Sequence, residues 1–181
     1  YIQTNQVKLG FNPGTFQLRK GATFHKSLLR QTEVLFLNKE EAQSWTKNTD
    51  DYEELCKRLS DLGPKIVVVT DGRKGAFSYS SEGFYYIAEF PGNRIEATGA
   101  GDSFATGYIA GLTNGLNHGQ AMAWGTANAA SVVLHVGPQA GLLTQPQIEE
   151  SLNKRPKYGS VHISDENTKV KIMELVKNKQ V

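Results

Sequence analysis

The sequence has 181 residues, of which 39% are hydrophobic and 21% charged, and its formal net charge is +2. This length corresponds to one domain of ordinary composition, which excludes a disordered or fibrous chain. No apolar run reaches the ~18 residues of a membrane span, and so small a charge predicts neither a nucleic acid nor a membrane as partner. The single cysteine, Cys56, excludes an internal disulfide and favours a reducing, cytoplasmic location.

Strands are predicted from short apolar or alternating segments. The expected strands cover residues 7–11, 33–37 and 66–70, and a hairpin joins 76–79 to 84–88 with Gly83 in its turn. The segment 66–70 is continuous and β-branched, which is typical of a parallel strand covered on both faces.

Helices are predicted between these strands. They cover 23–30, 50–62 with Asp50 as cap, two stretches within 99–136 divided near Asn114-Gly115, 145–152, and 165–179 with Ser164 as cap. Strands that alternate with helices indicate an α/β fold with a mainly parallel sheet. Residues 154–159 are the expected linker.

The segment 97–104 (Ala-Thr-Gly-Ala-Gly-Asp-Ser-Phe) is the one that indicates chemistry. Amides at a helix start are unpaired donors, and glycines at 99 and 101 let an anion approach them closely. Asp102 would repel a bound phosphate, so we interpret it as a base that takes a proton from an attacking hydroxyl. The alternative is an ordinary glycine-bearing helix start that Asp102 caps.

This segment, followed by Gly107, resembles the second signature of the ribokinase-like (PfkB) carbohydrate kinases. Three further segments resemble the family in the same order. They are Leu-Asn-Lys-Glu-Glu-Ala at 37–42, Val-Thr-Asp-Gly-Arg-Lys-Gly-Ala at 69–76, and the stretch from Ala-Asn-Ala-Ala at 127–130 to Gly137.

The resemblance implies a three-layer α/β/α fold. The chain starts at Tyr1 rather than at methionine, and nothing in it is similar to the substrate-binding strands and lid of the family's N-terminal part. We therefore expect residues 1–153 to form the C-terminal, nucleotide-binding portion of the fold, and residues 154–181 to form a linker and helical tail.

The resemblance also implies roles for individual residues. Asp102 would be the catalytic base, and the amides of Gly99, Ala100 and Gly101 would stabilise charge on the transferring phosphoryl group. Asn38 and Glu41 would hold Mg²⁺ and its waters. They also form a pattern typical of a capped helix start, and both interpretations can hold together.

Further residues are implied to contact the nucleotide. Thr70, Gly72 and Gly75 would border it, and Asn128 would lie near the adenine. Lys74 would contact phosphate, although a lysine in a turn is commonly just solvated. Glu96 stands where the family usually has aspartate, in a loop that helps relatives to bind a monovalent cation, which leaves a K⁺ site open.

The expected function is transfer of a phosphoryl group from ATP to a hydroxyl of a sugar or nucleoside, with ATP and Mg²⁺ required. The alternative is a nucleotide-binding module without activity of its own, because the substrate-binding part is absent. Relatives often dimerise through their lid strands, so a homodimer remains an open expectation.

Overall fold

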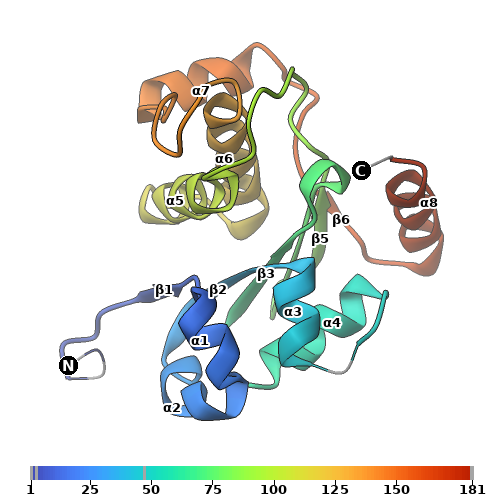
Figure 1. Cartoon of the computed structure of the whole chain (residues 1–181). Coiled ribbons are helices and arrows are strands. Elements are labelled where there is room, and N and C mark those ends of the chain that lie inside the picture. The colour runs from blue at the N-terminus through green and yellow to red at the C-terminus, as the bar shows by residue number, and fades with distance from the viewer. Residues whose placement is uncertain (1, 3, 47, 180–181) are drawn as a thin grey trace.

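The structure is a computed structural model that describes residues 2, 4–46 and 48–179 (Figure 1). One mixed sheet lies at its centre, with strands in the order β1-β2-β3-β4-β5-β6. The strands are β1 (Leu9–Phe11), β2 (Thr32–Asn38), β3 (Ile66–Thr70), β4 (Ala76–Ser80), β5 (Gly83–Ile87) and β6 (Val161–His162). β1, β2 and β3 run parallel, whereas the pairings from β3 to β6 are antiparallel.

Eight α-helices and two 3-10 turns are found in the described residues. The helices are α1 (Thr15–Lys20), α2 (Lys26–Leu29), α3 (Lys39–Trp45), α4 (Tyr52–Ser60), α5 (Ala100–Thr113), α6 (His118–Val132), α7 (Gln145–Asn153) and α8 (Glu166–Lys177), and the 3-10 turns are η1 (Ala22–His25) and η2 (Gly72–Lys74). None of these helices is long and apolar enough to cross a membrane.

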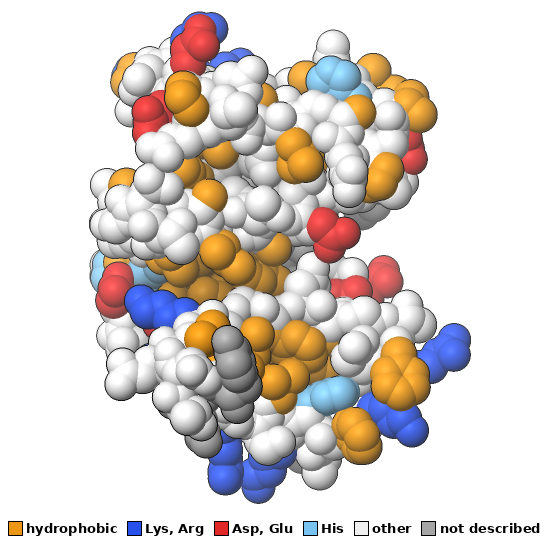
Figure 2. All heavy atoms as spheres, turned by 90° about the vertical axis from the view of Figure 1, so that its left-hand side faces the viewer, with side chains coloured by type: hydrophobic (Ala, Val, Ile, Leu, Met, Phe, Trp, Pro, Cys, Tyr) orange, Lys and Arg blue, Asp and Glu red, His pale blue; other side chains and the backbone are white. Residues whose placement is uncertain are grey.

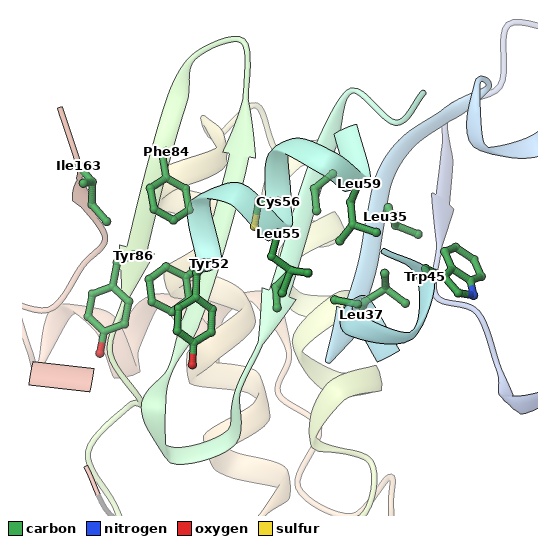
Figure 3. Close-up of a cluster of buried hydrophobic side chains, with 14 of the residues drawn as sticks. Leu35, Leu37, Trp45, Tyr52, Leu55, Cys56, Leu59, Phe84, Tyr86 and Ile163 are labelled. Carbon is green, nitrogen blue, oxygen red and sulfur yellow. The ribbon is translucent and has the colours of Figure 1, made fainter. Parts of the chain in front are cut away.

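The helices form one layer on each face of the sheet (Figure 1). Alternate side chains of a strand point to opposite faces, so Leu35 and Leu37 of β2 pack against α3, α4 and α8, whereas Val34 and Phe36 pack against α5 and α6. Figure 3 shows the first of these two buried clusters. The predicted α/β fold is confirmed, with a sheet that is parallel only in its first half.

Several predicted boundaries were wrong. The segment 23–30 is a 3-10 turn followed by the short helix α2, and α1 was not predicted at all. Helix α4 is capped by Asp51 rather than Asp50, and α8 by Asp165 rather than Ser164. In both helices the cap is the carboxylate that accepts hydrogen bonds from the amides of the first turn.

The C-terminal segment packs onto the body of the molecule. β6 pairs with β5, and Ile163 and Val176 are buried in the cluster of Figure 3. On α8, Lys169 pairs with Asp51 at 3.0 Å and with Glu53 at 2.8 Å. The division of the chain between residues 153 and 154 stays a prediction.

Helices α5 and α6 approach each other closely because glycines line their contact. A Cβ atom at Gly107 would lie 2.8 Å from the carbonyl oxygen of Trp124, and one at Gly125 would lie 2.8 Å from that of Phe104. Such distances leave no room for a side chain. The glycine surplus of this region therefore serves helix packing as well as the predicted anion site.

We predict that Gly107→Ala lowers the free energy of unfolding by about 1–3 kcal/mol, since the added methyl group overpacks this contact. Urea denaturation followed by circular dichroism measures the change. Gly101→Ala is the control in the same helix, because a Cβ atom there meets nothing within 4 Å. This control should be neutral or stabilising by up to about 1 kcal/mol, and equal losses in both variants would contradict the packing argument.

Candidate functional site

The site is built around the start of α5, which depends on Gly99. Gly99 has a φ of +79°, in the left-handed region. A Cβ atom at this position would also lie 2.6 Å from the carbonyl oxygen of Pro138. Both its backbone conformation and its neighbour therefore require glycine here, and together they aim the first turn of α5 along one direction.

The amides of this first turn are not equivalent. The amide of Ala100 donates to Ala97 O at 3.1 Å, and that of Ser103 donates to Gly99 O at 2.9 Å. Within the described part of the chain, no acceptor is found for the amides of Gly101 and Asp102. Of the three amides that the sequence indicated, that of Gly101 is therefore the clearest candidate to hold an anion.

Two cavities meet at this helix start. One, of about 290 Å³, is lined by Asp102 and Glu41 among others, and the second, of about 350 Å³, by Gly72 and Gly75 among others. The residues that line both are Asn38, Thr70, Gly101 and Phe104. We call them the acceptor-side and nucleotide-side cavities. In Figure 2 the molecule is hollowed between its upper and lower parts, with acidic side chains at the edge of the hollow.

Asp102 lies in the acceptor-side cavity, where its carboxylate is exposed. Asn12 donates from Nδ2 to Asp102 Oδ1 at 3.0 Å and so orients this carboxylate. The sequence analysis did not single out Asn12, which directly follows β1. Its position at the carboxyl end of a parallel strand was the available signal, because ligands of α/β sheets bind at that edge.

Asn38 and Glu41 form a capping box at the start of α3. Asn38 Oδ1 accepts from the amide of Glu41 at 2.9 Å, and Glu41 Oε2 accepts from the amide of Asn38 at 2.9 Å. Both residues also line the acceptor-side cavity. The predicted helix cap is thus confirmed, and the second carboxylate oxygen, Glu41 Oε1, has no hydrogen-bond donor among the described residues.

This donor set fits Mg²⁺ held through water. Magnesium prefers oxygen ligands, keeps several of its waters, and often binds proteins through a single carboxylate. The cap fixes Glu41 beside the cavity while leaving Oε1 available. In the described residues there is no cluster of three or more His, Cys, Asp or Glu side chains that could hold a metal. Only this pair is therefore a candidate.

The turn between β3 and β4 forms one wall of the nucleotide-side cavity. Thr70, Gly72 and Gly75 line it, as the sequence predicted for residues that border a nucleotide. Gly75 has a φ of +97°, and a Cβ atom there would lie 2.1 Å from Ile87 O. Lys74 does not line this cavity, and its Nζ lies 3.8 Å from Asp71 Oδ2.

Asn128 is buried rather than exposed to the cavity. Its Nδ2 donates to Ser103 O at 2.8 Å, and its Oδ1 accepts from the amide of Leu143 at 2.9 Å. Both ends of its amide group thus bind the protein itself. The nearby α6 residues that do line the nucleotide-side cavity are Thr126, Ala129 and Ala130.

Glu96 connects two loops near the cavity. Its Oε2 accepts from the amide of Gly137 at 3.0 Å. A hydrogen bond from the Thr98 side chain and this one from Gly137 hold the pKa of Glu96 below its usual value. The carboxylate is therefore charged at neutral pH, and its role toward K⁺ stays a prediction.

Solved structures place this architecture in a known class. The chain is similar to a putative ribokinase II from E. coli in complex with ATP and Mg²⁺, with a TM-score of 0.74 and 22% identity over 84% of this chain and 51% of that chain. It is also similar to a nucleoside kinase from Methanocaldococcus jannaschii, with a TM-score of 0.68 and 27% identity over 81% of this chain and 48% of that one. The fold is therefore ribokinase-like.

Residues 13–145 match the family described as pfkB family carbohydrate kinase, and the chain belongs to this family. It is 30% identical over 147 residues to a 5-dehydro-2-deoxygluconokinase of Geobacillus thermodenitrificans, a match that covers 78% of this chain and 44% of that protein. For the Bacillus subtilis protein of the same name, the identity is 27%, and 83% and 48% are covered. The chain spans about half the length of these curated relatives.

We predict that Gly101→Ala weakens binding of MgADP at least about tenfold, because the methyl group would occupy the space in which phosphate meets the Gly101 amide. Isothermal titration calorimetry measures the dissociation constant. Gly92→Ala is the matched control, since Gly92 lines the same cavity away from the helix start and a Cβ atom there also meets nothing within 4 Å. Equal affinities of the two variants would contradict phosphate binding at the start of α5.

Proposed function

We propose that this chain is the nucleotide-binding portion of a kinase that transfers a phosphoryl group from ATP to a hydroxyl of a sugar or nucleoside. The observation that carries the proposal is the junction of the two cavities. There the exposed carboxylate of Asp102 and the unpaired amide of Gly101 lie in one turn of helix. A base and an anion-binding donor are thus adjacent at the only place where both ligands could meet among the cavities described above.

In the proposed reaction, Asp102 accepts the proton of the acceptor hydroxyl as that oxygen attacks the γ-phosphorus of ATP. The bond between the γ-phosphorus and the β,γ-bridging oxygen breaks, and ADP leaves with that bond's electron pair. The amide of Gly101 and the positive end of the α5 dipole stabilise the charge on the transferring oxygens. Asn12 keeps the carboxylate turned toward the acceptor side.

Mg²⁺ would be held through water by Glu41, with Asn38 beside it, and when bound it supplies positive charge that offsets the charge of the phosphates. The capping box keeps both side chains in place before any ligand arrives, because each one already bonds the other's backbone amide. Preorganised ligands bind with a smaller loss of conformational entropy.

The acceptor proposed first is 5-dehydro-2-deoxygluconate, the substrate class in the name of the relatives that match this chain. The acceptor-side cavity holds polar groups that suit a hydroxylated ligand, among them Asn12, Thr15 and Asp102.

A second function is favoured by the length of the chain. Since it covers 44% of the Geobacillus relative, residues that select the acceptor in such a protein have no counterpart here. The alternative is therefore a module that binds nucleotide without turning it over. Release of ADP that depends on an acceptor, measured for this chain with ATP, Mg²⁺ and a panel of sugars, sugar acids and nucleosides, would exclude this alternative.

We predict that Asp102→Asn lowers acceptor-dependent ADP release by about 10²- to 10⁴-fold, because the amide cannot take the proton. A coupled assay for ADP measures turnover, and calorimetry measures the affinity for MgADP. That affinity should stay the same or increase, since a negative charge near the phosphates is removed.

The matched control for this prediction is Asp61→Asn, which neutralises an exposed aspartate at the end of α4. It should turn over like the unmodified chain. Turnover of Asp102→Asn at the level of this control would contradict the role of Asp102 as base. Nucleotide binding without ADP release in the unmodified chain would favour the binding module.

A further inference from the structure

The turn at residues 71–75 lines the nucleotide-side cavity but has little packing of its own. None of the three residues of η2 within it is buried, and Gly72 and Gly75 have positive φ angles of +49° and +97°. Glycine allows these angles but does not enforce them, because it also populates many others. Some other group must therefore hold the turn in the shape that borders the cavity.

One such group is the hydroxyl of Tyr52, which donates a hydrogen bond to Asp71 Oδ2. Asp71 itself organises the turn through its backbone. Its amide donates to Gly75 O at 2.9 Å, and its carbonyl oxygen accepts from the amide of Lys74 at 2.9 Å. Tyr52 lies in α4, far from the turn in sequence, so it anchors both ends of this small network to a buried helix.

The second group is the hydroxyl of Tyr86, which donates to Lys74 O at 3.0 Å. Figure 3 shows the hydroxyl groups of Tyr52 and Tyr86 at the same end of the buried cluster. Burial, with the hydrogen bond to Asp71 as a second cause, raises the pKa of Tyr52, and burial raises that of Tyr86 to about 12. Both hydroxyls therefore keep their protons and act as donors at neutral pH.

The rings of the two tyrosines are held independently of their hydroxyl groups. Phe77 of β4 stacks on Tyr52 with the ring centres 4.0 Å apart, and its centre lies 5.0 Å from that of Tyr86. Only 4% and 2% of the two tyrosines, respectively, are exposed. Replacement by phenylalanine thus leaves the packing of the rings in place and removes only the hydrogen bonds to the turn.

We infer that Tyr52 and Tyr86 are positioning residues for nucleotide binding, which act by holding the turn at residues 71–75 through Asp71 and the carbonyl group of Lys74. The inference rests on the proposed function, since it assigns the nucleotide to the cavity that this turn borders. Neither tyrosine lines that cavity. Their effect on a nucleotide is therefore transmitted through the backbone of Gly72 and Gly75.

The test compares Tyr52→Phe, Tyr86→Phe and the double variant with the unmodified chain. Each single change should weaken binding of MgADP about three- to tenfold, the effect of one lost hydrogen bond, and the double variant should weaken it further. Calorimetry at a temperature at which every variant is folded measures this affinity. Amide hydrogen exchange of the nucleotide-free protein should be faster at residues 72–75 and unchanged in β2.

Tyr79→Phe is the matched control, because Tyr79 packs beside the same cluster from β4 and does not bond the turn. It should keep the affinity and the exchange pattern of the unmodified chain. Unchanged exchange at residues 72–75 in the double variant, or unchanged affinity for MgADP, would overturn the positioning role. Failure of the unmodified chain to bind MgADP would instead overturn the proposed function, while the exchange experiment still decides whether the hydroxyls hold the turn.

Discussion

The contact between Gly99 and Pro138 is the constraint on which the rest of the site depends. It forces a left-handed residue immediately before α5 and brings the loop after α6 against it. Because a helix carries its unpaired amides at its first turn, the direction of α5 decides where an anion can bind. The Gly101 amide and the Asp102 carboxylate are adjacent in that turn, so one backbone angle positions both a donor and a base.

Behind that turn, the close approach of α5 and α6 keeps the helix from shifting. Gly107 and Gly125 allow backbone contact, and the buried amide of Asn128 links Ser103 in α5 to the amide of Leu143. A buried amide that finds partners at both ends restricts the packing to one arrangement, since any shift would leave a polar group unpaired. Rigidity thus comes from contacts that exclude side chains and from one saturated polar group.

Local patterns in the sequence were sufficient for the elements that bury a clear face. The predicted strand at residues 66–70 agrees with β3, and the glycine motif predicted the start of α5. Helix α1 was missed because it buries no residue and so shows no apolar period. The contact of Asn12 with Asp102 spans 90 residues of sequence, and no local pattern can indicate such a pair. The tyrosine contacts with the turn likewise arise only when the sheet has formed.

β1 has a partner strand on one side only. It pairs with β2, and in the part of the chain that the structure describes its other edge carries unpaired amide and carbonyl groups. Figure 2 faces this edge and shows apolar side chains gathered between it and the part of the molecule above. Ile109 and Leu112 of α5, beside this edge, are only partly buried. An open edge beside apolar surface attracts further strands, so the colloidal behaviour of this polypeptide depends on what covers β1, and crowded copies would first adhere there.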